Sequence, residues 1–255
     1  MRASMWLNAD RVLYVGLLGT PSLRTFGSYT LYVSLGAAHR ISFSGEPWQA
    51  GWLSIVPPGV PHRIAGSERM IATLLIEPET VSHENLPAFL RNRRGTLEEP
   101  RLLVAMHREL DAIRNGRPGP YERTTEFDMA FFGAELVSQA LDPRIRAVLN
   151  RMKSLPQCPY SARECADSIC VSASRFLHLF KEDIGVPFRN FRAWKRARSL
   201  LHHVKEEESL TNIALDAGYP DSTHFSHTIR TVYGLTPRSI LVGCRQLKLH
   251  HAPAL

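Results

Sequence analysis

The sequence has few cysteines and no long hydrophobic run. Its four cysteines form no Cys-x-x-Cys pair and have no histidine at zinc-finger spacing, so neither a metal site nor a disulfide framework is expected. The apolar stretch at residues 12–18 is too short to cross a membrane and lacks a cleavage signal. We therefore predict a cytoplasmic protein without metal, cofactor or membrane partner. Its reduced thiols would be Cys158, Cys165, Cys170 and Cys244.

The first half of the chain also lacks an excess of charge of either sign. Residues 1–141 hold 14 basic and 14 acidic residues, whereas residues 142–255 hold 17 and 10 and so carry the whole formal charge of +7. A basic excess confined to one half suggests a polyanionic partner, although mildly basic globular halves are common. With 255 residues, 44% of them hydrophobic, the chain can form two folded domains.

The N-terminal part predicts a small β-sandwich or barrel. Short apolar or alternating runs, separated by glycine and proline, are typical of strands joined by turns. The runs fall at residues 12–18, 29–35, 52–56 and 70–76. Prolines on both sides of Gly59 predict a rigid reversal of the chain after the third run.

Residues 98–141 change to helical periodicity. Two apolar stripes predict a helical hairpin, with one helix that stops at Gly116 and a second over residues 123–141. The hairpin either only covers the sheet or also acts as a linker or dimerisation element through an apolar seam. Asp142 before Pro143 then predicts a helix start and a domain boundary, because Asp is a good N-cap and Pro fits the first turn.

The C-terminal part contains a helix-turn-helix pattern. Ser161 and Glu164 form a capping box before a short helix. After a tight turn, Ser172 caps a second helix that ends at Gly185. Apolar positions at i, i+3 and i+4 leave the opposite face of this helix to short and cationic side chains, which suit base edges and phosphates.

The same pattern recurs about 48 residues later, and such a repeat is hard to produce by chance. Ala166 corresponds to Ala214, and Cys170 corresponds to Gly218, where the turn between the helices needs a left-handed residue. A helix over residues 187–203 is predicted to join the units rigidly. Its basic positions, which we expect to be partly solvated and partly phosphate-facing, are Arg189, Arg192, Lys195, Arg196 and Arg198.

These motifs resemble the signature of the AraC/XylS family of bacterial transcription regulators over residues 142–241. The likeness is carried by residues 214–219, 222–225 and 233–237, and by the first unit up to Pro187. It implies an α+β chain whose C-terminal domain has about seven helices. One helix of each unit would enter successive major-groove segments of promoter DNA. The resemblance also implies RNA polymerase as a partner, activation more often than repression, and no enzymatic activity.

The resemblance assigns DNA contacts by position to the second helix of each unit. The positions are Ser174, Arg175, Leu177, His178, Lys181, Ser222, Thr223, Ser226, His227 and Arg230. Many family members have arginine where this chain has His178 and His227, and histidine is shorter and only partly charged near neutral pH. The base preference at these two positions therefore stays open. Cys170 in place of glycine leaves the geometry of the first turn open as well.

Residues 1–97 resemble, more weakly, the cupin-like sensing domains of this family through residues 57–63. Metal-binding cupins carry a His-x-His pair with a following glutamate, whereas this stretch has only the isolated His39 and His62. A cupin-type metal enzyme with a DNA-binding appendage is therefore the weaker alternative. The organisation we predict is a cupin-like domain at 1–97, the hairpin at 98–141 and a DNA-binding domain at 142–255.

The role of the N-terminal half has two interpretations. In the first, it binds a small-molecule effector in a pocket lined by some of Trp6, Tyr14, Trp48 and Trp52, although such aromatic residues are more often plain core. Alternatively, it binds no small ligand and serves only to join subunits, as in a homodimer.

Overall fold

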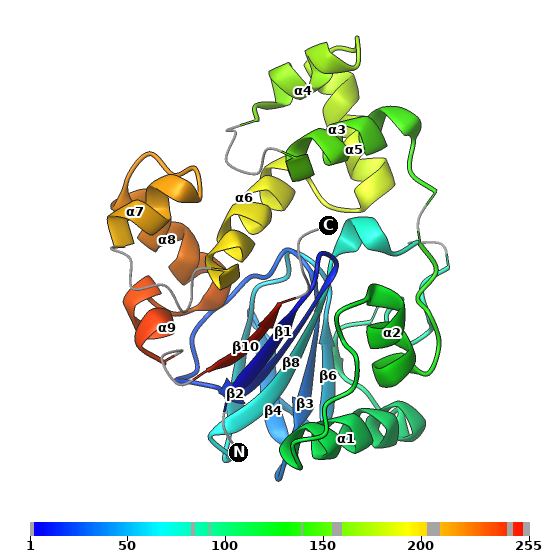
Figure 1. The fold of residues 1–255 in the computed structure, drawn as a ribbon, viewed down its shortest axis with the longest axis vertical. Coiled ribbons are helices and arrows are strands. Elements are labelled where there is room, and N and C mark those ends of the chain that lie inside the picture. Colours follow the sequence, from blue (N-terminus) through cyan, green and yellow to red (C-terminus); the bar gives the residue numbers. More distant parts are fainter. Residues whose placement is uncertain are drawn as a thin grey trace.

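The computed structural model describes residues 3–82, 85–91, 93–138, 140–154, 160–202, 210–243 and 247–251. Figure 1 shows a sheet-rich N-terminal part against which the helical C-terminal part is packed. The overall α+β class agrees with the prediction. Cys158, Cys244 and His203 lie outside the described residues. None of the described helices has the length and apolar composition that a membrane span needs.

Two sheets form the N-terminal part. The larger has the strand order β10-β1-β2-β8-β3-β6-β9 and the smaller has the order β5-β4-β7. Neighbouring strands are antiparallel, except that β10 runs parallel to β1. The strands are β1 Ser4–Leu7, β2 Arg11–Leu17, β3 Tyr29–Ser34, β4 His39–Phe43, β5 Gln49–Gly51, β6 Leu53–Val56, β7 His62–Gly66, β8 Met70–Ile76, β9 Gly95–Thr96 and β10 Lys248–His251.

The four predicted strand runs are confirmed as β2, β3, β6 and β8, and Gly59 adopts the expected left-handed conformation with φ of 76°. The larger sheet is buried on both faces. Along β2, Val12 packs in the core shared with the smaller sheet and the C-terminal helices, whereas Leu13 and Val15 pack in the core under α1 and α2. Burial on both faces explains why these strands are continuous apolar runs.

The predicted hairpin is present but shorter than expected. Helix α1 spans Pro100–Arg114 and α2 spans Thr124–Phe132, and both pack on the larger sheet (Figure 1). The prediction that the second helix continues to residue 141 is wrong. Gly133 ends it in a left-handed cap, with φ of 74°, and its N–H donates to the Met129 carbonyl.

Buried Asp128 holds the chain after α2 in place. Its carboxylate accepts hydrogen bonds from Nε and Nη2 of Arg11, each at 2.8 Å, and one from the backbone N–H of Leu136. This anchors the segment beyond the helix end against β2. The described residues show the hairpin covering the sheet, while its role toward a second subunit stays a prediction.

The C-terminal part contains the predicted series of helices. They are α3 Pro143–Ser154, α4 Ala162–Ser168, α5 Ala173–Ile184, α6 Phe188–Ser199, η2 Leu200–His202, α7 Leu210–Asp216, α8 Ser222–Tyr233 and α9 Pro237–Gly243. The predicted caps are confirmed: Ser161 and Glu164 form the capping box of α4, and Ser172 accepts the Arg175 N–H at the start of α5. Asp142 accepts the Arg144 N–H ahead of α3.

The two inter-helix turns share their geometry despite different residues. Gly218 has φ of 73° and Cys170 has φ of 55°. Within the described residues, Cys170 is the sole non-glycine residue with positive φ, so the first turn carries a conformation that side chains disfavour. The expected turn geometry is therefore reached with cysteine as well.

Replacing Cys170 with glycine should raise the free energy of unfolding by about 0.5–1 kcal/mol. Relief of the left-handed strain exceeds the entropy that glycine adds to the unfolded chain. Urea unfolding followed by circular dichroism measures the change. Cys170→Ala keeps the Cβ atom and should give no gain. A glycine variant that is less stable than the alanine variant would contradict the strain at this turn.

Candidate DNA-binding interface

The first helix-turn-helix unit has its own hydrophobic core. Phe176, Leu179 and Phe180 of α5 point inward, as predicted, and pack with residues of α3, α4 and the start of α6. The opposite face of α5 is exposed. It carries all five positions predicted for this unit: Ser174, Arg175, Leu177, His178 and Lys181.

One feature of this face was not expected from the sequence. His178 Nε2 lies 3.1 Å from the Glu182 carboxylate one helical turn away, and both side chains are exposed. Protonated His178 would therefore be partly neutralised before DNA arrives. Since i,i+4 pairs at a surface are weak, the pair leaves His178 able to turn toward another partner.

The second unit repeats this arrangement on α7 and α8. Phe225 and Ile229 are buried, and Asp221 caps α8 by accepting the N–H groups of Thr223 and His224. Of the predicted positions, Thr223, His227 and Arg230 are exposed, whereas Ser222 and Ser226 are half-buried. Both units thus present their predicted residues on one accessible helix face.

The two units differ in how they are attached. Unlike the first unit, the second shares a hydrophobic core with the sheets: Trp194, Phe225, Ile229 and Tyr233 pack in the same cluster as Tyr32 and many other strand residues. In Figure 1, α9 lies beside the sheet and α7 and α8 lie above α9 at the upper left, while α3, α4 and α5 lie farther away, beyond the upper end of the sheet.

Specific contacts reinforce this attachment. Phe26, from the loop between β2 and β3, makes edge contacts with the Trp194 and Tyr233 rings at centroid distances of 5.8 and 5.6 Å. The backbone N–H of Thr25 donates to the Val232 carbonyl at 3.0 Å. Strand β10, which follows α9, adds to the sheet beside β1. The second unit is therefore fixed to the N-terminal part by its core, its backbone and its C-terminal strand.

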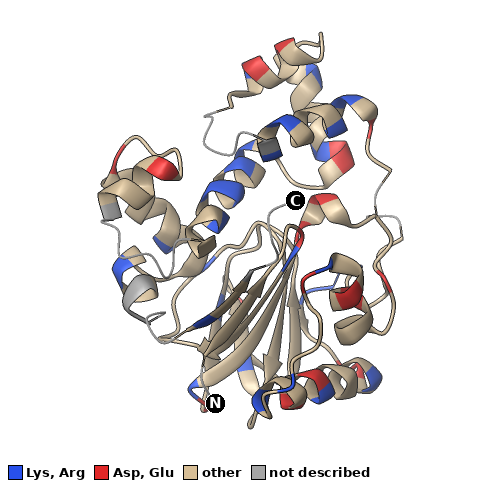
Figure 2. Cartoon of the chain, in the orientation of Figure 1, with Lys and Arg blue, Asp and Glu red and all other residues tan. Residues whose placement is uncertain are grey.

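The basic face of α6 is divided between the protein interior and its surface. Figure 2 shows the run of basic residues along this helix. Arg189 is exposed, but Lys195 and Arg198 turn toward two buried carboxylates, Glu77 and Glu79, next to strand β8. The expectation of a solvated or phosphate-facing role is wrong for these two cations, because each is ion-paired inside the molecule.

Glu77 is the centre of this cluster. Its carboxylate accepts Trp194 Nε1–H at 3.0 Å and lies 2.5 Å from Lys195 Nζ and 2.8 Å from Arg198 Nε. Burial opposes its ionisation, but the neighbouring charges of Lys195 and Arg198 outweigh burial and lower the pKa of Glu77. Burial raises the pKa of Glu79, which lies 2.5 Å from Lys195 Nζ. Sequence reasoning missed both acids.

The predicted aromatic pocket residues do not come together. Trp6 is buried and stacks on His250, whereas Trp48 and Trp52 are exposed at the surface. Of the four, Tyr14 lines a cavity of about 290 Å³ between the larger sheet and the second unit. Of the residues offered for an effector pocket, Tyr14 therefore lines this cavity, Trp6 belongs to the core, and Trp48 and Trp52 lie next to strand β5 at the surface.

His39 and His62 are both fully buried and hydrogen-bonded. His39 bonds the hydroxyls of Ser34 and Ser54, at 2.8 and 2.7 Å, while His62 bonds the Tyr32 hydroxyl at 2.8 Å. Burial lowers the pKa of each to about 4. Within the described residues, no group of three or more histidine, cysteine, aspartate or glutamate side chains is placed to hold a metal ion.

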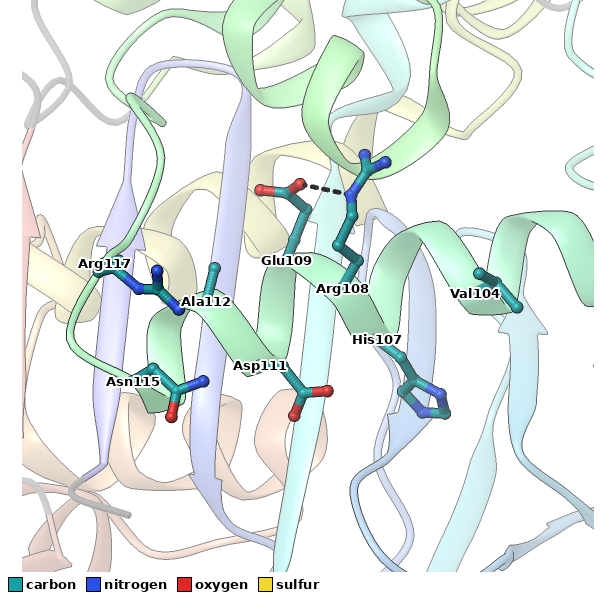
Figure 3. Close-up of a pocket in the computed structure, with 8 residues that line it drawn as sticks. All are labelled: Val104, His107, Arg108, Glu109, Asp111, Ala112, Asn115 and Arg117. Carbon is teal, nitrogen blue, oxygen red and sulfur yellow. Dashed lines mark hydrogen bonds and ion pairs between the residues drawn. The ribbon is translucent and has the colours of Figure 1, made fainter.

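A second hollow follows the outer face of α1 (Figure 3). It is open to solvent, and its charged lining mixes both signs; Arg108 pairs with Glu109 at 3.3 Å. Its lining therefore offers no single chemistry for a ligand.

A family model described as "Helix-turn-helix domain" matches residues 165–241, from within α4 to within α9. The invasion protein InvF of Salmonella typhimurium is 30% identical over 80 residues, which cover 25% of this chain and 37% of InvF. The arabinose operon regulatory protein of Escherichia coli is 25% identical over 125 residues, which cover 44% of this chain and 40% of that protein. The chain thus spans less than half the length of these relatives.

Solved structures of ToxT from Vibrio cholerae resemble nearly the whole chain. Apo ToxT of Vibrio cholerae superposes with a TM-score of 0.60 at 12% sequence identity, covering 92% of this chain and 98% of ToxT. The likeness concerns the fold, and it includes both the sheet-rich part and the two helix-turn-helix units.

Proposed function

We propose that this chain, whose C-terminal domain is an AraC-type helix-turn-helix domain, is a sequence-specific DNA-binding transcription regulator. The observation that carries the proposal is the duplicated unit: α5 and α8 each bury an apolar face and expose short, polar and cationic side chains. Such helices fit the major groove, where hydroxyl and imidazole groups reach base edges and Arg and Lys reach phosphates.

In this proposal the chain acts by binding DNA and not by catalysis. It is an activator of transcription and contacts RNA polymerase. Two relatives support this direction: the Pseudomonas aeruginosa ArgR is named a transcriptional regulator, and the Escherichia coli Ada protein is named a transcriptional activator as well as a DNA repair enzyme. Each matches this chain over less than half of its own length.

The N-terminal part acts as a sensor of a small-molecule effector in the cytoplasm. Its cavity lies against the second unit, so occupancy can change how that unit is held. ToxT, which shares the fold, has been solved with an unsaturated fatty acid bound, and this supports an effector role for the architecture.

Selection of DNA by the full chain from a random pool tests the proposal. The recovered site should contain two conserved blocks about 10 base pairs apart, because two reading helices of one rigid body face the same side of the duplex. Affinity should fall steeply with salt, by about 0.9 in log–log slope for each phosphate neutralised. Failure to enrich any sequence at low salt would refute DNA recognition.

Substitutions on α5 and α8 should affect separate blocks. Ser174→Ala with His178→Ala should relax base preference in one block, and Thr223→Ala with His227→Ala in the other, each at a cost of about 1–3 kcal/mol in discrimination. Repeating the selection with each double variant measures this. Arg108→Ala, on exposed α1, is the control and should alter neither block. Equal effects of both double variants on both blocks would contradict separate reading.

A further inference from the structure

The exposed face of α5 carries a carboxylate among its hydroxyl, imidazole and cationic groups. Glu182 follows Ser174 and His178 at intervals of four residues, so the three side chains form one row along this face, the α5 row. The neighbouring acid Asp183 is half-buried and turns away, since it accepts the backbone N–H of Asp142 at 2.8 Å. Glu182 is therefore the acid of α5 that lies on the exposed face.

His178 is the partner of this carboxylate. Its Nε2 lies 3.1 Å from Glu182 Oε1, and both side chains are more than half exposed. Among the described residues, no lysine or arginine forms an ion pair with Glu182. A surface pair of this kind is weak in water, but it becomes stronger where DNA displaces the solvent around it. The imidazole can thus hold the carboxylate in place once DNA is bound.

The second unit has no carboxylate at the matching position. In α8 the corresponding row is Thr223, His227 and Thr231, and all three side chains are exposed. Each row ends three residues before the left-handed glycine that caps its helix, Gly185 or Gly234, which fixes the correspondence. Thr231 is uncharged, and its Oγ1 donates to the His227 carbonyl at 3.0 Å. The two units therefore share a histidine but differ in the group one turn beyond it.

A carboxylate on a DNA-binding face is unfavourable beside phosphates and beside base edges that carry only acceptors. In the major groove, guanine presents N7 and O6 and thymine presents O4, and all of these are acceptors. Adenine presents the N6 amino group as a donor but also the acceptor N7. Cytosine presents the N4 amino group without an acceptor, so it is the base that suits a carboxylate. A carboxylate at this position therefore selects by rejecting the other bases as well as by binding one.

We propose that Glu182 is a specificity-determining residue of the first unit. Its carboxylate accepts a hydrogen bond from N4 of a cytosine in the block of the DNA site that α5 reads, and His178 holds the carboxylate in position. The assignment rests on the DNA-binding function proposed above, and it adds a base and the side chain that selects it. In the block that α8 reads, the row of Thr223, His227 and Thr231 provides no carboxylate and so no such selection of cytosine.

Selection from a random DNA pool with the full chain, as wild type, Glu182→Gln and Glu182→Ala, tests the assignment. The wild type should favour cytosine by about tenfold at one position of the block that α5 reads. Glu182→Gln should move this preference to adenine, because an amide has both a donor and an acceptor and matches N6 and N7. Glu182→Ala should remove the preference without creating another. A wild type that selects no cytosine in this block, or the same cytosine preference in all three proteins, would overturn the assignment.

Thr231 offers both a matched control and a gain-of-function test. Thr231→Ala changes the equivalent position of α8 and should leave the cytosine preference in the block that α5 reads as it is in the wild type. Thr231→Glu places a carboxylate one turn beyond His227 and should create a cytosine preference in the block that α8 reads. Loss of the wild-type cytosine in Thr231→Ala, or an unchanged α8 block in Thr231→Glu, would count against reading by a carboxylate at this position of the row.

Stability and non-specific binding separate base reading from a structural role. Both Glu182 variants should unfold at nearly the wild-type temperature, because substitutions at exposed positions change stability little. By gel shift at low salt, their affinity for DNA of unrelated sequence should rise about threefold, since a negative charge facing phosphates is removed. A large fall in the thermal midpoint would assign Glu182 to the fold instead. Failure of every protein to enrich DNA would count against DNA recognition itself, whereas enriched blocks that do not depend on residue 182 would overturn this assignment alone.

Discussion

Replacing Glu77 with alanine is expected to lower the free energy of unfolding by about 3–5 kcal/mol, the usual cost of breaking a buried ion pair on one side. The carboxylate is fully buried and contacts Trp194, Lys195 and Arg198 of α6. Its removal leaves two cations inside the interface with only Glu79 nearby, and burial already disfavours the charged form of Glu79. The loss should appear as separation of the C-terminal part from the sheet as well as reduced overall stability.

Urea unfolding by circular dichroism measures the energy, and limited proteolysis in native buffer reports the separation. Glu46→Ala is the matched control, because Glu46 pairs with Arg94 near the surface, where a salt bridge contributes about 1 kcal/mol or less. A Glu77→Ala chain as stable and as protease-resistant as Glu46→Ala would show that the cluster does not hold the two halves together.

A double-mutant cycle measures the interaction energy between Glu77 and its partner Lys195. Combining Glu77→Gln with Lys195→Met should cost less than the sum of the two single changes, by roughly 0.5–3 kcal/mol, because each single variant leaves the other group unpaired. Additive costs would mean that the two side chains do not interact, whatever their separation of 2.5 Å in the structure.

The features that could be predicted from the sequence are those set by residues close together in the chain. The caps of α3, α4 and α5, the left-handed turns at Cys170 and Gly218 and the apolar stripe of α6 depend on neighbours within a few positions, and they are present in the structure. The repeat of about 48 residues then located helices α5 and α8, the second helix of each unit. Their exposed faces follow from the same periodicity.

The features that could not be predicted from the sequence depend on contacts between residues far apart in the chain. Glu77 and Lys195 are 118 positions apart, and nothing in either neighbourhood indicates that they meet. Strand β10 is only four residues long, and so short a segment has no clear strand pattern in the sequence. It is held by its parallel pairing with β1, which lies more than 200 positions earlier in the chain. The end of α2 is set by Gly133 and by Asp128, whose partner Arg11 lies on a distant strand.

Lowering the pH from 8 to 5 is expected to cost the fold about 4 kcal/mol through His39 and His62 together. Each has a pKa of about 4 in the folded chain against 6.5 unfolded, chiefly because of burial. A depressed histidine pKa means that the unfolded chain binds more protons, so the stability present above pH 6.5 is lost as the pH falls toward 4. By linkage, each residue contributes about 2 kcal/mol of this loss at pH 5.

Comparing the pH dependence of unfolding free energy in the wild type and in single-histidine variants separates the contribution of His39 and His62 from that of other titratable groups. Glu79, whose pKa is raised, acts in the opposite direction, but it does so equally in wild type and variants and cancels in the difference. In His39→Gln or His62→Gln, the stability lost between pH 8 and pH 5 should shrink by about 2 kcal/mol, even if the variant is less stable throughout. Parallel pH profiles for the wild type and the two variants would show that the buried imidazoles do not govern acid stability.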